Sequence, residues 1–261
     1  MDLAALALLG VVLGVLFWRA VNRERRDYAR FKRMRSTIAR QKVFRRWLAE
    51  GALVLGGLSV ATITGAWQAI PEVLAAAQEW PPIAALRESW LGPWGWPVAI
   101  VGTLLVLAAL ILPVLSIRKS LEEAPAIGDI RALLPRTRGE LPYGAALSLN
   151  AGIFEELLFR LGMPALVFAV TGNAVLAFAV ATLIFGLLHI YQGPLGVLFS
   201  TILGVVFLLL YLVTGWIVVP IVLHALIDLR SMILIPVVLG RIPLRPKPAE
   251  PVGPTAGVTE G

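Results

Sequence analysis

The chain has 261 residues, of which 58% are hydrophobic and 15% are charged. The hydrophobic residues fall in blocks long enough to cross a bilayer, whose core requires about 20 apolar residues per helix, so no separate soluble domain fits. The absence of cysteine excludes disulfides, thiolate metal sites and a cysteine nucleophile. The formal net charge is +7, but twelve of the 23 Lys and Arg residues lie between residues 19 and 46. This placement favours anionic lipid headgroups, and not nucleic acid, as the partner of residues 19–46.

The first apolar block covers residues 3–18, and the basic cluster follows it. This order predicts a retained membrane helix with its N-terminus outside, because positive charge favours the cytoplasmic side. Within residues 19–46, apolar residues recur at helical spacing among the arginines, which predicts an amphipathic helix along the cytoplasmic surface. These apolar residues are Tyr28, Phe31, Met34 and Ile38. A solvated basic loop is the alternative for this segment.

Six further spans are predicted from the remaining apolar blocks. They cover residues 47–70, 97–117, 143–164, 174–190, 195–213 and 216–239. The segment 71–96 is acidic and carries four tryptophans, which is typical of an interfacial segment on the outer face. Turns are predicted at residues 171–173, 191–194 and 214–215. Pro164 is expected to end or bend the fourth span, and Pro220 and Pro236 are expected to kink the seventh.

The predicted fold is therefore an all-α polytopic membrane protein with about seven, and between six and eight, transmembrane helices. We divide it into an N-terminal helix with its basic segment, two further spans with their loops, a membrane core and a disordered cytoplasmic tail. The boundaries are 1–46, 47–140, 141–240 and 241–261. Because every basic cluster falls on one side, the chain is predicted to be integral to a bacterial-type inner or plasma membrane, with its C-terminus in the cytoplasm.

Few ionisable side chains of the acidic, basic or histidine type occur between residues 143 and 240. They are Glu155, Glu156, Arg160, His189, His224, Asp228 and Arg230. One charge at the centre of a membrane helix costs at least about 2.5–3.5 kcal/mol, so this group implies mutual pairing, a water-filled cavity or chemistry. Successive helical residues point about 100° apart, so Glu155 can face a cavity while Glu156 turns to Arg160. His224 and Asp228 share a helix face, as do Phe185 and His189.

A carboxylate with two imidazoles, no cysteine and no apparent serine nucleophile fits the activation of water better than a covalent intermediate. Each residue also has an ordinary structural interpretation, because a lone buried histidine is usually a satisfied donor and Glu156 with Arg160 is a common i,i+4 pair. The site is expected between the C-terminal spans. The sequence alone does not show that these helices are in contact.

Three motifs occur in order on three different spans. They are Glu155-Glu156-x-x-x-Arg160, Phe185-x-x-x-His189 and His224-x-x-x-Asp228. This set resembles the CPBP family, which comprises the type II CAAX-prenyl proteases and their bacterial relatives in bacteriocin processing and self-immunity, also called Abi proteins. The resemblance covers about residues 141–230 and implies an intramembrane glutamic endopeptidase with a multi-helix fold, a membrane-associated peptide or protein substrate and no metal cofactor.

By this resemblance, Glu155 would be the general base and His189 would help to bind and activate the water. His224 and the residue at position 228 would stabilise the oxyanion, but the prenyl proteases have Asn where this chain has Asp228. Because an ionised Asp cannot donate a hydrogen bond, Asp228 is expected either to be protonated or to orient His224 as a carboxylate orients imidazole in a triad, and we favour orientation. Glu156, Arg160 and Phe185 would support these residues, with Arg160 able to reach a substrate carboxylate.

Two other functions fit the same residues. A zinc-dependent membrane protease could use Glu155, His189 and His224 as three ligands with an open position for water. A non-catalytic protein, either a scaffold of the self-immunity kind or a proton-linked carrier that uses Glu and His as a relay, would need no hydrolytic site. Replacement of Glu155 separates the enzyme from the scaffold.

Overall fold

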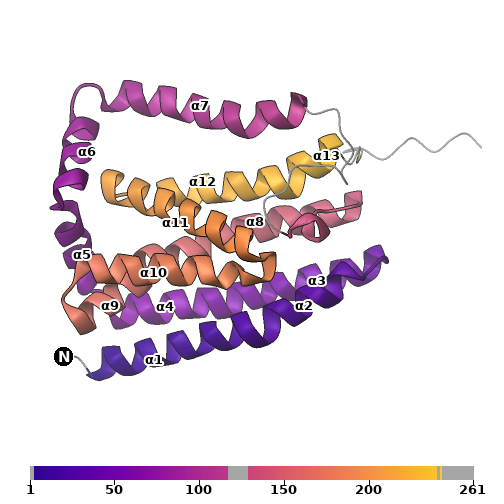
Figure 1. Ribbon diagram of the computed structural model, residues 1–261, viewed down its shortest axis with the longest axis horizontal. Coiled ribbons are helices and arrows are strands. Elements are labelled where there is room, and N and C mark those ends of the chain that lie inside the picture. The colour runs from indigo at the N-terminus through magenta and orange to yellow at the C-terminus, as the bar shows by residue number, and fades with distance from the viewer. Residues whose placement is uncertain (1–2, 117–128, 240–241, 243–261) are drawn as a thin grey trace, which may run out of the picture.

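The structure of the protein, a computed structural model, describes residues 3–116, 129–239 and 242 (Figure 1). These residues contain helices and no strands, so the predicted all-helical class is confirmed. Six of the described helices are long and apolar enough to cross a membrane, within the predicted range of six to eight. They are Leu3–Lys32, Thr37–Gly65, Gly95–Ser116, Ala174–Gln192, Pro194–Thr214 and Val218–Leu239. The predicted tail, residues 241–261, lies outside the described residues except for Ile242.

The remaining predicted span is also an unbroken helix, although its charged residues keep it out of these six. It consists of α8 (Leu141–Glu156), a π-helical turn η6 (Leu157–Gly162) and α9 (Met163–Thr171). Pro164 does not end this helix. A proline has no N–H to donate to the preceding turn. The π-turn before Pro164 accommodates the missing hydrogen bond, because the N–H of Met163 donates to the carbonyl of Leu158, five residues earlier.

The N-terminal third forms a helical hairpin. Its first arm is α1 (Leu3–Trp18), η1 (Arg19–Glu24) and α2 (Arg25–Lys32), and its second is α3 (Thr37–Glu50), η2 (Gly51–Leu55) and α4 (Gly56–Gly65). The prediction of one surface helix over residues 19–46 was wrong, because this segment continues both membrane helices and contains the turn between them. The buried rings of Phe31 and Phe44 lie 5.1 Å apart, so the two arms cover each other's aromatic faces. Most of the described basic side chains lie outside, but Arg40 is buried beside these rings.

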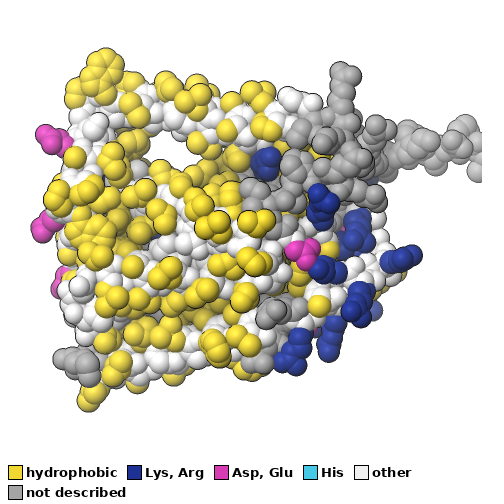
Figure 2. Space-filling view, in the orientation of Figure 1, with side chains coloured by type: hydrophobic (Ala, Val, Ile, Leu, Met, Phe, Trp, Pro, Cys, Tyr) yellow, Lys and Arg dark blue, Asp and Glu magenta, His cyan; other side chains and the backbone are white. Residues whose placement is uncertain are grey.

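Two short helices and one long helix follow the hairpin. They are α5 (Ala69–Gln78), α6 (Pro81–Leu91) and α7 (Gly95–Ser116). The acidic segment 71–96 is thus largely helical, and α5 and α6 run across the end of the bundle opposite the turn between α2 and α3 (Figure 1). In Figure 2, most Lys and Arg gather at one end of the molecule, and most of the visible Asp and Glu lie at the opposite end. The helix α7 lies at the edge of the bundle, with Gly95 and Val114 as its only buried residues.

The C-terminal helices complete the bundle. They are α10 (Ala174–Leu188), the 3₁₀ turn η7 (His189–Gln192), α11 (Pro194–Thr214), α12 (Val218–Leu229), the π-turn η8 (Arg230–Leu234) and α13 (Ile235–Leu239). The three predicted turns are confirmed, each with a glycine at positive φ: Gly172 (65°), Gly193 (81°) and Gly215 (72°). Pro220 does not kink its helix, because it lies in the first turn of α12, where the donor that it lacks has no partner within the helix. At Pro236 a π-turn precedes the proline, as at Pro164.

A buried ion pair joins the hairpin to the segment before α8. The Nε atom of Arg40 on α3 lies 3.0 Å from Oε1 of Glu140, and both side chains are fully buried. Arg40 also donates to the carbonyls of Ala132 and Leu134, while the other oxygen of Glu140 accepts from the backbone N–H of Arg136. This network holds α3 against residues 132–140 at the basic end of the bundle.

Candidate active site

Close packing of α8 against α12 brings two of the three motifs together. Gly152 makes this contact possible, because a Cβ atom there would lie 2.9 Å from both Cβ and N of Ala225. One turn further along α8, Glu156 reaches the neighbour of Ala225, His224. A contact between residues 68 positions apart thus follows from one glycine at the helix crossing.

Glu156 is the buried centre of this contact. Its Oε1 accepts a hydrogen bond of 2.8 Å from Nδ1 of His224, and its Oε2 lies 3.3 Å from Nε of Arg160. Arg160 is itself buried and donates through Nη2 to the carbonyl of Gly204 on α11. Glu156 therefore ties α8, α11 and α12 together, and Arg160 is directed into this network, not toward a substrate.

Aromatic rings enclose the same charges. The Phe207 ring stacks on His224 with centroids 4.9 Å apart, and the Phe185 ring meets the same imidazole edge-on at 6.0 Å. The guanidinium of Arg160 lies over the Phe185 ring at 4.8 Å, a distance typical of cation–π contacts. Phe185 also contacts His189, with ring centroids 5.0 Å apart. Phe185 thus touches three of the predicted site residues.

The expectation that Asp228 orients His224 was wrong in this structure. The carboxylate Oδ2 of Asp228 lies 3.8 Å from Nε2 of His224, beyond hydrogen-bond distance. Glu156 occupies the orienting position at Nδ1 instead. Asp228 nevertheless remains close to the His224 imidazole.

Glu155 and His189 face a separate cavity of about 150 Å³, which we call the inner cavity. Glu155 is half-buried, and its Oε2 is inaccessible and makes no hydrogen bond to any described residue. Nδ1 of His189 lies 2.8 Å from the carbonyl of Phe185, so Nδ1 is the protonated nitrogen and Nε2 the acceptor. Glu155 and Glu156 therefore diverge as the helix geometry predicts, one to a cavity and the other to Arg160.

The inner cavity is lined by residues from both halves of the chain. They are Leu16, Arg19, Trp47, Gly51, Leu55, Leu147, Asn150, Ala151, Glu155, Phe159, Leu188, His189 and Tyr191. Three π-turns and one 3₁₀ turn border it, namely η1, η2, η6 and η7. Such interruptions of α-helix are frequent at functional sites. Two of them, η1 and η2, belong to the N-terminal hairpin, which carries no motif.

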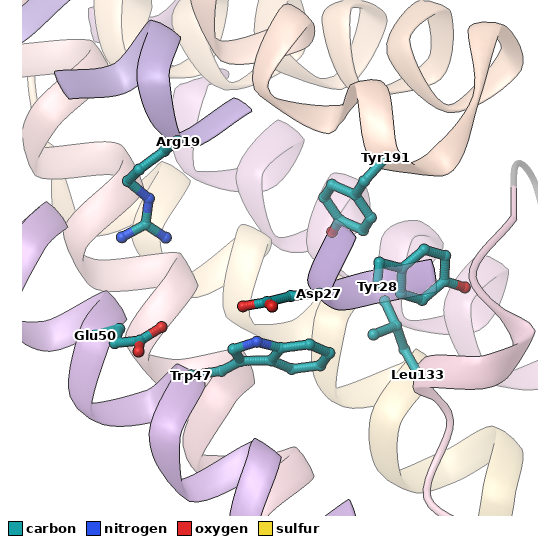
Figure 3. Close-up of a pocket in the computed structure, with 7 residues that line it drawn as sticks. All are labelled: Arg19, Asp27, Tyr28, Trp47, Glu50, Leu133 and Tyr191. Carbon is teal, nitrogen blue, oxygen red and sulfur yellow. The ribbon is translucent and has the colours of Figure 1, made fainter. Parts of the chain in front are cut away.

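An adjoining outer cavity of about 150 Å³ shares Arg19, Trp47 and Tyr191 with the inner one. Figure 3 shows its lining, in which the charged ends of Arg19, Asp27 and Glu50 face one another beside the Trp47 indole. Residues at the basic end of the hairpin therefore line a second cavity next to the inner one.

The three residues considered as zinc ligands do not form a metal site. His224 does not line the cavity that contains Glu155 and His189, and its Nδ1 is bonded to Glu156. Within the described ranges, no group of three or more His, Cys, Asp or Glu side chains is placed to hold a metal ion. Glu155, His189 and His224 are therefore not placed around one common position in this structure.

Sequence reasoning missed several residues of the inner cavity. A search restricted to ionisable residues within the C-terminal spans passes over Asn150, although Leu147, Asn150, Ala151 and Glu155 follow one another at helical spacing. A polar residue in an apolar helix was the available signal. No signal marked Arg19 or Trp47, because the contact between the hairpin and α8 is a long-range feature of the fold.

Residues 137–230 match the sequence model of a family described as type II CAAX prenyl endopeptidase, Rce1-like. The matched segment contains all three motifs and excludes the N-terminal hairpin. Searches of curated proteins and of solved structures gave no match. Together with the apolar helices, the family match supports an integral membrane protein in a lipid environment with a membrane-associated peptide substrate. Residues 137–230, and with them the candidate site, are therefore similar to the Rce1-like family of type II CAAX prenyl endopeptidases.

Proposed function

We propose that this protein is a metal-independent intramembrane endopeptidase in which Glu155 and His189 activate a water molecule to hydrolyse a peptide bond of a membrane-associated protein. The observation that carries the proposal is that Glu155 and His189, from α8 and η7, line one cavity. Oε2 of Glu155 makes no bond to the described residues, and Nε2 of His189 is the acceptor nitrogen. These groups can hold a water molecule between them and take its proton.

The buried charges next to this cavity have a supporting role in the proposal. Glu156 fixes the tautomer and orientation of His224 through the bond to Nδ1, as a carboxylate does for imidazole in a catalytic triad. Arg160 balances the charge of Glu156, and Asp228 acts at longer range. In this arrangement the motif residues form a water-activating pair and a charged network directly behind it.

The test is a peptidase assay in liposomes on a library of membrane-anchored peptides. Wild-type protein should release fragments at the same rate with and without a chelator, whereas the His189→Ala variant should be slower by about 10²–10⁴-fold, the usual contribution of a group that handles the proton. His224→Ala is not a suitable control because it leaves Glu156 unpaired. Tyr143→Phe, on the same helix as Glu155 but outside the inner cavity, serves instead.

Three outcomes would count against the proposal. Equal rates for wild type and His189→Ala would remove the water-activating pair. Loss of activity with a chelator, restored by zinc, would favour the metal-dependent alternative. If intact wild-type protein releases no fragment from any peptide, the non-catalytic scaffold becomes the better explanation.

We also propose that the basic end of the bundle lies in the cytoplasm against anionic headgroups. The separation of basic and acidic side chains to opposite ends supports this orientation (Figure 2). Because the chain has no cysteine, single introduced cysteines can report the orientation of the protein in the membrane. A membrane-impermeant maleimide should label Ser89→Cys, on α6, in intact cells, and should label Ser36→Cys, between α2 and α3, only after the membrane is opened. The reverse pattern would invert the topology.

A further inference from the structure

Hydrolysis in the inner cavity requires a donor for the negative charge that develops on the carbonyl oxygen. The family resemblance assigns this role to His224 and the residue at position 228. Neither of these residues lines the cavity that contains Glu155 and His189, and Asp228 has no donor when ionised. A further side chain on the wall of this cavity could therefore supply the donor that Asp228 does not.

Besides His189, whose N–H is bonded to the carbonyl of Phe185, four side chains of the inner cavity carry an N–H or O–H group. They are Arg19, Trp47, Asn150 and Tyr191. Three of them also line the outer cavity, where Arg19 faces Asp27 and Glu50 (Figure 3). Asn150 alone belongs only to the inner cavity. A carboxamide is also neutral, so it can approach a developing oxyanion without pairing with Glu155 beforehand.

The surroundings of Asn150 hold its amide in place and leave donor capacity. Nδ2 makes one hydrogen bond among the described residues, to the carbonyl of Leu48 at 3.4 Å, which is long for an N–H···O bond. A carboxamide nitrogen has two N–H donors. Oδ1 lies against Gly51, where an added Cβ would come within 2.5 Å of it. The absence of a side chain at Gly51 therefore makes room for this amide.

The spacing along α8 suits a water-mediated reaction. Asn150 and Glu155 are five residues apart, or about 7.5 Å along the helix axis at 1.5 Å per residue. A general base must be about 3 Å from the water, and an oxyanion donor about 3 Å from the carbonyl oxygen. At about 100° per residue the two side chains also point about 140° apart, yet both line the inner cavity, so they reach it from different sides and the water and the scissile carbonyl can lie between them.

We propose that Asn150 is a further catalytic residue, which donates an N–H to the oxyanion of the tetrahedral intermediate. This inference rests on the proposed function. Glu155 takes a proton from water, the hydroxide oxygen bonds to the carbonyl carbon, and the C=O electron pair moves to the oxygen that faces Asn150. When the intermediate collapses, the carbonyl re-forms, the C–N bond breaks and Glu155 returns the proton to the leaving amine. The products are a carboxylic acid and an amine.

The first measurement is the steady-state kinetics of Asn150→Ala on a peptide that the wild type cleaves. We expect kcat to fall by about 10²–10³-fold, the usual effect of removing one oxyanion donor, with KM within twofold of wild type. Gly51→Ala keeps the amide but displaces it, so it should show a smaller fall in kcat. Ser148→Ala is the matched control, because its hydroxyl donates to the carbonyl of Gly144 within the same helix.

The second measurement separates catalysis from structure. A phosphinate peptide has an anionic tetrahedral phosphorus that imitates the intermediate. Its affinity for Asn150→Ala should fall by the same factor as kcat, whereas an uncleavable substrate analogue should bind the wild type and the variant equally. Unchanged kcat, or equal weakening of both ligands, would overturn the assignment. If Asn150→Ala does not fold, Gly51→Ala provides the same comparison. An inactive Glu155→Gln beside an active Asn150→Ala rejects only this inference, whereas an active Glu155→Gln rejects the proposed function.

Discussion

Replacing Glu155 by Gln should abolish most hydrolysis without harming the fold. The amide keeps the size of the carboxylate but cannot take a proton from water, so the rate should fall by about 10²–10⁴-fold. Stability should be unchanged or slightly higher, because Oε2 of Glu155 is buried and makes no hydrogen bond to the described residues, and an unpaired buried charge is costly. The measurement combines cleavage rates in liposomes with unfolding in mixed micelles.

The neighbouring glutamate provides the control. Glu156→Gln removes the charge that pairs with His224 and Arg160, and breaking a buried ion pair typically costs about 3–5 kcal/mol. This variant should therefore lose stability as well as activity. The assignment of chemistry to Glu155 would fail if Glu155→Gln kept full activity, or if both variants lost stability to the same extent.

Arg40 and Glu140 should show the largest effect on stability away from the site. Each single change, Arg40→Met or Glu140→Leu, leaves one fully buried charge without its partner and should lower the free energy of unfolding by about 3–5 kcal/mol. The double variant should recover much of this loss, because two apolar side chains can replace a buried pair. Reversible unfolding of the four proteins in mixed micelles measures the coupling.

Variants of this pair also test whether stability can be lost without a loss of activity in the folded protein. Arg40 and Glu140 do not line the inner cavity, so the folded fraction of each variant should cleave peptides at the wild-type rate. A loss below about 1 kcal/mol for both single variants would mean that water reaches the pair, as it does for surface ion pairs.

Local patterns predicted the membrane helices and turns. The length of an apolar block and the position of a turn glycine both depend only on neighbouring residues. The divergence of Glu155 from Glu156 also follows from helix geometry alone. The partner of His224 could not be predicted, since Glu156 lies 68 residues earlier in the chain, whereas Asp228 lies one helical turn away. Helix spacing favoured Asp228, but the close crossing at Gly152 favoured Glu156.

The basic segment shows a second kind of limit. The spacing of Tyr28 and Phe31 correctly indicated an apolar helical face, but a pattern does not say what covers that face. Phe44 covers it, and residues 19–46 fold back on themselves. For the same reason Arg19 and Trp47 could not be placed in the inner cavity before the hairpin was seen against α8.

The hairpin's share in the inner cavity has a consequence for how relatives of this protein can diverge. The family match begins at residue 137, whereas Leu16, Arg19, Trp47, Gly51 and Leu55 form the facing wall. The wall that the hairpin forms can therefore differ between relatives while Glu155 and His189, the proposed water-activating pair, stay the same. Chains that share this core but carry another N-terminal hairpin would keep the reaction and accept different substrates, so similarity over the core alone is a poor guide to what such a protein cleaves.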